Sequence, residues 1–405
     1  MTVDVVIVGG GPAGAAVASH LARAGREVVL LERAPAYRWH AGGVFTSPAA
    51  VSALRRLGLT DDLLHVIARP VPAMRVETRS GVTFRMTYGD DGSLSAPAVG
   101  LDRAVLDPIL LDLASRAGAA VRMGVTVTRV ERPARGGMPF QLDLRSPSGG
   151  VWHEAARVVV GADGIRSQVA RSLGVGRPAR LGARIGLTFH LADPGSDGPR
   201  DARMRVLRDG YIGIAPVPRG RVNVGIVLGR SWRPMLFAEG AQRLAARIVR
   251  AVPRTDDDPA TWRTGDRCDA VVGAAPIGHR VTRPAGSRWF LVGDAAGFLD
   301  PFTGEGLHRA LVSAELAADA IEGLLAGRRG APAAYLRAMH ARFRAKDRVS
   351  WLVQAFLSQP ALFDYAARRL ARRPGPRETL GLVMGDLVPA ERALDPRFLA
   401  ALLAP

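Results

Sequence analysis

Three glycines near the start of the sequence have the spacing of a phosphate-binding turn. Gly9, Gly11 and Gly14 form the pattern GxGxxG between an apolar run at 3–8 and a helix-like run at 13–24. In such a turn the first glycine allows a tight bend, the second lets the backbone approach a pyrophosphate, and the third allows close helix packing. The helix N-terminus adds free N–H groups and the positive end of a dipole. These residues predict a site for a dinucleotide diphosphate.

An acidic residue ends the next apolar run, EVVLLER at 27–33. The carboxylate of Glu32 can accept hydrogen bonds from ribose hydroxyls, and its charge disfavours a 2'-phosphate. FAD and NAD both fit this pattern. A glycine-rich turn without a ligand is the alternative, but strand, helix, second strand and terminal acid in this order favour the dinucleotide.

Two later segments repeat the combination of an apolar run, a glycine and an aspartate. VVVGADGIRSQ contains Asp163 and Gly164, and FLVGDAAGFLDPFTGEGLHRAL contains Gly293 and Asp294. Neither segment has the full GxGxxG pattern, so a separate nicotinamide domain is not expected. We interpret both as distant parts of the first nucleotide site.

The composition is that of an ordinary globular protein. The chain has 405 residues, 48% of them hydrophobic, which is enough for a large core divided over two or three domains. The formal net charge is +18, but Lys346 is the only lysine and the arginines are scattered along the chain. Specific nucleic-acid binding is therefore not expected. An anionic cofactor or a membrane surface suits scattered arginines better.

Cysteine use and the N-terminal residues favour a reducing compartment. Cys268 is the only cysteine, which excludes an internal disulfide and a cysteine-based zinc site, and we expect no metal. The first apolar run contains Asp4 and lacks a basic leader, so it predicts a strand rather than a signal peptide. No apolar run reaches the roughly 18 residues that a membrane span needs. We therefore expect a cytoplasmic protein.

Periodicity predicts sheet and helix segments in alternation. Strands are expected at 3–8, 27–33, 121–131, 156–161 and across 183–230, and helices at 13–24, 50–67 and 101–118, followed by a helical C-terminus interrupted at prolines 332, 360, 374 and 376. Short alternating segments from about 71 to 100 are typical of an antiparallel sheet with one face in water. Nucleotide-type pieces thus recur at three places, with sheet-like inserts between them.

With these motifs the chain resembles the FAD-dependent family typified by para-hydroxybenzoate hydroxylase, which combines an N-terminal GxGxxG with later Asp-Gly and Gly-Asp motifs. The resemblance covers most of residues 1 to 325 and implies FAD as the cofactor. It implies that Asp294 holds the ribityl chain and that Arg103 is directed at the FAD phosphates. It also implies that the backbone at Val125 contacts adenine and that Asp163 shapes the FAD cleft and is linked to NAD(P)H use. Besides the three glycines of the first turn and Glu32, the residues expected to line the cofactor site are Pro12, Ala13, Arg33, Gly42, Gly43, Arg103, Val125, Asp163, Gly164, Gly293, Asp294, Pro301, Gly304, Glu305, Gly306 and Leu307.

The resemblance implies an α/β fold with two interleaved domains. We expect a discontinuous Rossmann-like FAD-binding domain, a mixed or antiparallel β-sheet substrate domain, and a helical C-terminal region. The expected FAD-binding segments are 1–70, 101–178 and 276–325, the substrate-sheet segments are 71–100 and 179–275, and the C-terminal region is 326–405.

The turn PFTGEGL is similar to that of the geranylgeranyl reductase-like branch of this family. Two segments depart from that branch. Ala41 occupies the place of a cysteine before Gly42 and Gly43, and YIGIAP keeps Tyr211 and Pro216 of a Tyr-x-Trp-x-Phe-Pro strand without its large aromatics. The substrate pocket is therefore expected to take a different small apolar or aromatic molecule. The lysine and the Trp-x-Trp-x-Ile-Pro strand of the halogenases are both missing from their expected places.

Two reactions follow from a flavin reduced by NAD(P)H. The first is an NAD(P)H-dependent monooxygenase that hydroxylates or epoxidises an apolar small molecule through a flavin C4a-hydroperoxide. The alternative is hydride transfer to a carbon–carbon double bond, as in geranylgeranyl reductases. A third hypothesis is a non-catalytic flavoprotein or a basic surface-binding protein.

Four residues are candidates for catalytic roles. His40 and His308 flank the expected flavin site and could donate a proton, with a structural histidine as the alternative. Glu305 is a candidate base, although a carboxylate at a helix N-terminus is explained equally well by the helix dipole. Tyr211 is a candidate substrate contact, with core packing as the alternative.

One segment near the C-terminus is a candidate for membrane contact. SWLVQAFLSQPALFDYAARRLARR, at 350–373, has an amphipathic pattern that suits the surface of a bilayer and a lipid substrate. Packing on the core as a cap over the substrate pocket is the simpler interpretation.

Overall fold

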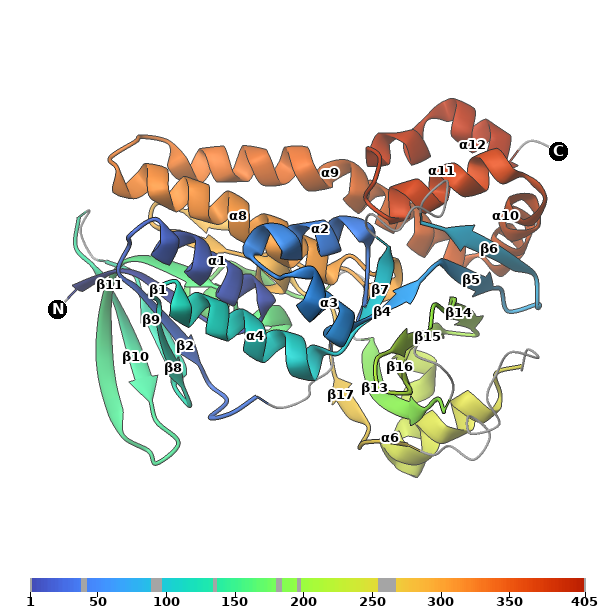
Figure 1. The fold of residues 1–405 in the computed structure, drawn as a ribbon, viewed down its shortest axis with the longest axis horizontal. Helices are drawn as coiled ribbons and strands as arrows, with labels where there is room; N and C mark the ends of the chain where they lie inside the picture. Colours follow the sequence, from blue (N-terminus) through green and yellow to red (C-terminus); the bar gives the residue numbers. More distant parts are fainter. Residues whose placement is uncertain are drawn as a thin grey trace.

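The computed structural model describes residues 2–37, 42–88, 97–133, 137–179, 184–194, 198–253 and 267–403. Two large sheets lie side by side along the molecule, and helices cover them (Figure 1). The mixed α/β fold expected from the sequence is confirmed.

The first sheet of the described chain has eight strands. Its strands are β1 (Thr2–Val8), β2 (Val28–Glu32), β8 (Ala120–Met123), β9 (Thr126–Glu131), β10 (Phe140–Arg145), β11 (Val151–Gly161), β19 (Ala285–Gly286) and β20 (Trp289–Leu291). The neighbours β20, β11, β1, β2 and β8 run parallel. Helices cover one face, and the β9–β10 hairpin and a short helix cover the other, so the side chains of β1 are buried on both faces. This explains its continuous apolar pattern.

The helices associated with the first sheet differ from the expected pattern at one place. They are α1 (Pro12–Arg23), α2 (Pro48–Leu57), α3 (Asp61–Ile67), α4 (Arg103–Arg116), α5 (Gln168–Ser172) and α8 (Gly306–Leu325). The single helix expected at 50–67 was wrong, because Gly58 takes a left-handed conformation with φ +114° and ends α2. In the same way Gly124, with φ +75°, divides the strand expected at 121–131.

The second sheet has seven strands in the described chain. They are β5 (Ala73–Glu77), β6 (Thr83–Thr87), β13 (Ile185–Ala192), β14 (Ala202–Leu207), β15 (Gly210–Val217), β16 (Arg221–Leu228) and β17 (Val272–Ala274). Its outer face is covered by α6 (Arg233–Arg250), a helix that was not expected within this segment. Apolar residues of α6, such as Leu244 and Ile248, are one turn apart and pack on the odd-numbered residues of β13.

A small third sheet connects the two large ones. It contains β3 (Phe45–Thr46), β4 (Ala68–Val71) and β7 (Ala98–Leu101). The expectation that all of 71–100 belongs to one antiparallel sheet was wrong, because β7 pairs with β3 and β4 instead. A Cβ at Gly100 would collide with the carbonyl oxygen of Pro216 on β15. Glycine at this position therefore allows backbone contact between two sheets.

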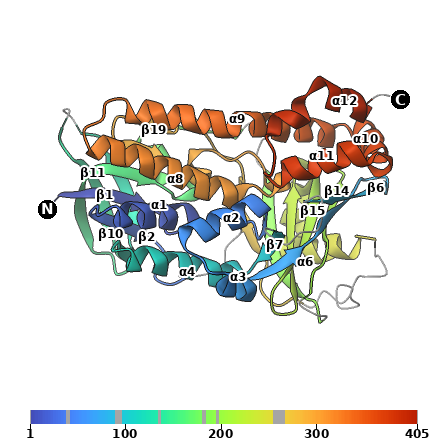
Figure 2. The same ribbon diagram turned by 45° about the horizontal axis from the view of Figure 1, so that its top comes forward.

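The C-terminal region is helical, as expected. Its helices are α9 (Ala331–Ser358), α10 (Pro360–Arg372), α11 (Pro374–Met384) and α12 (Pro396–Leu403). The four prolines that were expected to interrupt this region lie in the first turns of α9, α10 and α11, where a missing N–H costs no hydrogen bond. Figures 1 and 2 both show α9 running along one side of the molecule, from beside α8 to the C-terminal helices over β6.

Two further sets of short elements complete the description. They are the strand pair β12 (Gly176–Arg177) and β18 (Arg280–Val281), and the 3-10 turns η1 (Gly164–Arg166), η2 (Arg230–Trp232), η3 (Gly293–Ala296), η4 (Pro301–Thr303) and η5 (Ala390–Leu394).

Within the described residues, each helix is too short or too polar to span a bilayer. Apolar residues of the amphipathic segment at 350–373, including Phe356 and Leu370, pack against the second sheet.

The contact between the third sheet and β15 gives a stability prediction. Gly100→Ala is expected to lower the free energy of unfolding by about 1–3 kcal/mol, because the methyl group forces two backbones apart. Gly225→Ala is the matched control, since a Cβ there would have no atom within 4 Å. Urea denaturation of the two variants measures the difference. Equal stability of both variants would contradict the close approach.

Candidate functional site

The glycine turn between β1 and α1 has the geometry of a phosphate cradle. Gly9 has φ +106°, and a Cβ at Gly14 would collide with the carbonyl oxygen of Gly9. A Cβ at Gly11 would meet no atom within 4 Å. The turn is thus closed where the helix packs and open at the position expected to face a pyrophosphate.

Glu32 lies beside this turn at the end of β2. Its Oε2 accepts a hydrogen bond from the Gly10 N–H at 2.7 Å, and its Oε1 accepts one from the Ala34 N–H at 2.8 Å. The N–H of Val125 donates to the main-chain oxygen of Glu32 at 2.8 Å. The carboxylate therefore stabilises the turn, and Val125 is held next to it. Contacts of both residues with adenosine remain predictions, and so does that of the exposed Arg33.

The Asp-Gly turn after β11 packs directly against the glycine turn. A Cβ on Gly9 would lie 2.9 Å from the Cα of Asp163. Oδ2 of Asp163 accepts hydrogen bonds from the N–H groups of Gln168 and Val169 at the start of α5, at 2.6 and 3.1 Å. Its Oδ1 is buried without a hydrogen-bond partner in the described chain, and burial raises the pKa of this carboxyl. Asp163 thus caps a helix with one carboxylate oxygen, while its other oxygen is buried without a partner in the described chain.

The Gly-Asp turn after β20 completes the same edge of the sheet. A Cβ on Gly293 would lie 3.0 Å from Cβ of Ala13 in α1, and the Gly293 N–H donates to Oγ of Ser313 at 2.8 Å. Asp294 follows at once. Burial raises the pKa of its carboxyl to about 6, although the charges of Arg103 and Arg309 act in the opposite direction.

Arg103 is fixed near Asp294 by its own helix. The Arg103 guanidinium donates to both carboxylate oxygens of Asp107, at 2.6 and 2.9 Å, and to the main-chain oxygen of Gly43 at 3.0 Å. This geometry holds a buried positive charge against Gly43, and the charge acts against the rise in the pKa of the nearby Asp294 carboxyl. A direct contact with FAD phosphates remains a prediction, because three of the guanidinium's donor sites already have protein partners.

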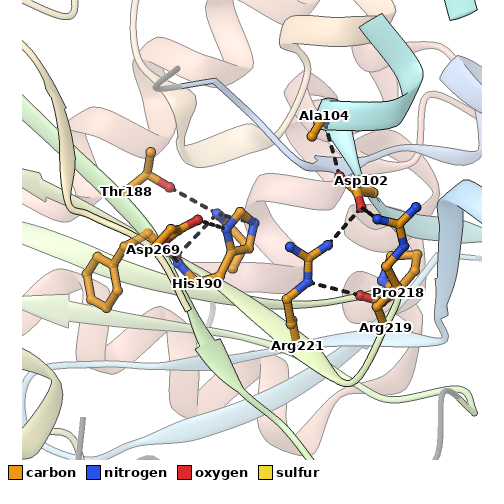
Figure 3. Close-up of polar contacts among 10 residues, drawn as sticks. Asp102, Ala104, Thr188, His190, Pro218, Arg219, Arg221 and Asp269 are labelled. Atoms are coloured by element: carbon orange, nitrogen blue, oxygen red, sulfur yellow. Dashed lines mark hydrogen bonds and ion pairs between the residues drawn. The ribbon is translucent and has the colours of Figure 1, made fainter. Parts of the chain in front are cut away.

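The residue before Arg103 links the two large sheets. Asp102 accepts a hydrogen bond from the Ala104 N–H at the start of α4. Its Oδ2 also forms ion pairs with Arg221 of β16 at 2.7 Å and with Arg219 at 3.6 Å (Figure 3). On the neighbouring strand, His190 Nδ1 lies 2.6 Å from Asp269. The orientation of α4, and hence of Arg103, therefore depends on the second sheet, which is called the substrate sheet below after the role expected for it from the sequence.

The turn expected to face the flavin, residues 301–306 and here called the flavin turn, is also anchored to the substrate sheet. Tyr211 of β15 donates its hydroxyl hydrogen to Oδ1 of Asp300 at 2.6 Å, and Arg184 forms an ion pair with Oδ2 at 2.6 Å. The ring of Tyr211 packs edge-on against Phe302 with centroids 5.0 Å apart. Burial, followed by the charge of Asp300, raises the pKa of the Tyr211 hydroxyl, which stays protonated. Tyr211 thus positions the turn, and Asp300 is its partner.

Gly304 and the start of α8 form the rest of this turn. Gly304 has φ +69°, and a Cβ there would lie 2.6 Å from the ring of Phe45 in β3. Pro301 opens η4, and Gly306 and Leu307 begin α8. Positive φ and close packing on Phe45 explain why glycine is needed at 304.

The two acid–base candidates of the turn differ in their surroundings. His308 is buried, with Nδ1 at 3.0 Å from Asp386 and Nε2 at 3.2 Å from Arg342. Both ring nitrogens therefore have protein partners, which favours the structural role. Glu305 is nearly buried and lies 3.6 Å from Lys346. His40 and Ala41 lie outside the described residues, so their predicted roles are not placed.

Sequence reasoning missed several charged residues that the fold brings to this turn. Asp300 precedes Pro301 in the motif, so the sequence shows an acid at this place. Its partner Arg184 directly precedes β13 and is far away in sequence. Lys346 lies on α9 and Asp386 follows α11, and their ion pair beside Glu305 has no local sequence signal.

The residues present fit FAD. The open cradle at Gly11, the unsatisfied Asp163 oxygen and the half-buried Asp294 lie along the carboxyl edge of one parallel sheet. The turn from Pro301 to Gly306 continues from that edge toward the substrate sheet, and an extended dinucleotide suits such a site.

Comparisons with known proteins agree with this assignment. A family model described as an FAD binding domain matches residues 2–342. The menaquinone reductase of Mycolicibacterium smegmatis is 30% identical over 326 residues, which cover 78% of this chain and 75% of that protein. Digeranylgeranylglycerophospholipid reductase 1 of Methanococcoides burtonii is 27% identical over 332 residues, with 78% and 75% covered.

A solved structure shows the same fold over the whole chain. It is that of a geranylgeranyl bacteriochlorophyll reductase-like protein from Thermoplasma acidophilum, with a TM-score of 0.77, 21% identity, and 100% of this chain and 96% of that chain covered. The chain therefore belongs to the FAD binding domain family, as an enzyme of the FAD-dependent oxidoreductases that resembles the geranylgeranyl reductase-like branch.

Proposed function

We propose that this protein is an FAD-dependent reductase of carbon–carbon double bonds in an apolar, prenyl-type chain. The similarity to the menaquinone reductase, at 30% identity over most of both chains, is the observation that favours reduction over oxygen insertion. The similarity to the digeranylgeranylglycerophospholipid reductase favours a prenyl-type chain as the substrate. The TGEGL form of the turn at 303–307 agrees with it. The proposal thus prefers the reductase alternative to the monooxygenase expected from the sequence.

The inner face of the substrate sheet supports an apolar ligand. Gly213 pairs with Gly225 across β15 and β16, on the face that also includes Tyr211. Gly213 occupies the tryptophan position of the geranylgeranyl-type strand, and a Cβ at Gly225 would meet no atom within 4 Å. A Cβ at Gly213 would lie 3.4 Å from Cε of Met204, so the open space on this face is at Gly225. Buried Met204 and Val227 make the surroundings apolar.

The chain's own residues would hold and orient the cofactor. Residues of the glycine turn would bind the diphosphate, and Asp294 would bind the ribityl hydroxyls. The N-terminus of α8 would present its positive dipole end to the flavin. Bound FAD supplies hydride acceptance and donation. The Tyr211–Asp300–Arg184 group keeps the turn rigid and retains the Tyr211 proton at Oη. NAD(P)H is the proposed electron donor.

The reaction type is tested by assay without oxygen. Protein reduced with NAD(P)H or dithionite is expected to saturate prenyl double bonds anaerobically, with mass spectrometry showing a gain of two hydrogens per bond. Air should lower the yield, because oxygen consumes the reduced flavin. Product that forms only with oxygen and contains an added oxygen atom would contradict the proposal and support the hydroxylating route.

Cofactor binding is tested at Asp294. Asp294→Asn is expected to weaken FAD binding by about ten- to a hundredfold, because a charged acceptor of ribityl hydroxyl groups is lost. Asp319→Asn, an exposed carboxylate on α8, is the matched control and should bind FAD normally. Flavin fluorescence during titration of the apoprotein measures both. Unchanged affinity in Asp294→Asn would refute the assigned role.

A further inference from the structure

A buried group of charges lies directly behind the flavin turn. Its four members, here called the turn cluster, are Glu305, His308, Lys346 and Asp386. Lys346 is the only lysine of the chain and is 3% exposed. Its Nζ donates to Oδ1 of Asp386 at 2.9 Å and to the main-chain oxygen of Val383. The ammonium is thus fixed by the segment at the end of α11.

Glu305 is the least satisfied member of the turn cluster. Lys346 Nζ is 3.6 Å from Glu305 Oε1, which is too long for a hydrogen bond. This oxygen is buried and has no hydrogen-bond partner in the described chain. The Glu305 side chain is 11% exposed, and it does not cap α8. The ionised form of a buried carboxylate is costly in free energy when one of its oxygens has no hydrogen-bond donor, and this favours binding of a proton.

The charges around Glu305 come from three elements. Lys346 on α9 and Arg309 on α8 favour the ionised form, whereas Asp386 after α11 opposes it. A hydrogen bond from the side chain of Thr303 in η4 also favours the ionised form. Burial is the largest influence and raises the pKa of Glu305. Burial acts in the same direction on Asp386, but the hydrogen bond from His308 and the charge of Lys346 outweigh it, so the pKa of Asp386 is lowered. Asp386 therefore stays ionised while Glu305 is poised to titrate.

We propose that Glu305 takes up a proton when the bound flavin is reduced, and that Lys346 is the positioning residue that sets the pH range of this uptake. A nicotinamide or another hydride donor gives two electrons and one hydrogen nucleus to the flavin, which gains one negative charge. Glu305 takes one proton from solvent, and this cancels the added charge. The donor is oxidised, the flavin is reduced, and the site keeps its net charge.

The direction of the coupling follows from like-charge repulsion. A new negative charge next to a buried carboxylate raises the pKa of that carboxylate further. Between the pKa of Glu305 in the oxidised protein and its higher pKa in the reduced protein, reduction therefore adds a proton. Below this window Glu305 is protonated in both states, and above it Glu305 is ionised in both. The proposal concerns the flavin alone and does not depend on the identity of the substrate.

The number of protons bound per two electrons is the measurable quantity. Spectroelectrochemical titration of the FAD-loaded protein, from roughly pH 5 to 9, gives this number from the slope of the midpoint potential against pH. Wild type is expected to show one proton more than Glu305→Gln within the window. The matched control is Glu322→Gln. Glu322 lies near the C-terminal end of α8, where it forms an ion pair with Arg26, and this variant should behave as wild type. Identical slopes for wild type and Glu305→Gln would overturn the proposal.

Substitution of Lys346 tests the second half of the proposal. Lys346→Met removes a charge that lowers the pKa of Glu305, so the window should move to higher pH. Lys346→Arg should keep it near the wild-type range. If Lys346 had only a structural role, its substitution would change FAD affinity or stability but not the pH range of proton uptake. That result would contradict the assignment.

Infrared difference spectra allow a test on the unsubstituted protein. Reduction within the window is expected to produce the carbonyl band of a protonated carboxylic acid, which shifts in D2O and is absent in Glu305→Gln. This readout does not require Lys346 variants to fold. A wild-type spectrum without such a band would overturn the proposal.

Discussion

The parallel register of four strands is the constraint on which the candidate site depends. Val8 of β1 lies opposite Leu31 of β2 and Gly161 of β11, and Gly161 lies opposite Leu291 of β20. Strands in this register end at the same edge of the sheet. The glycine turn, Glu32, the Asp-Gly turn and the Gly-Asp turn each follow one of these ends, so one edge collects four motifs from distant parts of the chain.

The second constraint is the connection between this edge and the substrate sheet. Asp102 with Arg221, Asp300 with Tyr211 and Arg184, and the close approach of Gly100 to Pro216 join the two at separate points. Buried ion pairs contribute little net stability once desolvation is counted. Their geometry is nevertheless strict, because removing one partner leaves a buried charge uncompensated. They therefore specify how the flavin turn faces the sheet rather than how stable the fold is.

The C-terminal helices have a role that their position in sequence does not suggest. α9 and the end of α11 bring Lys346 and Asp386 behind the flavin turn, and α11 packs on the end of β6 at Gly381. The region is thus a wall of the site as well as a cover for the substrate sheet. In this arrangement Glu305 has a cation nearby but no hydrogen-bond donor from it, which is the feature that distinguishes Glu305 from the fully paired His308 and Asp386.

The sequence alone was sufficient for the fold class, the family and the expectation that three separate motifs belong to one site. Gly9, Asp163 and Asp294 each follow an apolar run in a local motif, so their places at strand ends could be predicted from a few neighbours each. Their contacts with FAD stay predictions. Errors arose where a local pattern was compatible with two structures: Gly58 broke an apparently continuous helix, and β7 paired with a sheet other than the expected one. The partners of the flavin turn were decided only by tertiary structure. Arg184, Lys346 and Asp386 meet Asp300 and Glu305 through packing between elements distant in sequence, and the long reach of charged side chains leaves no periodic or local signal of such contacts.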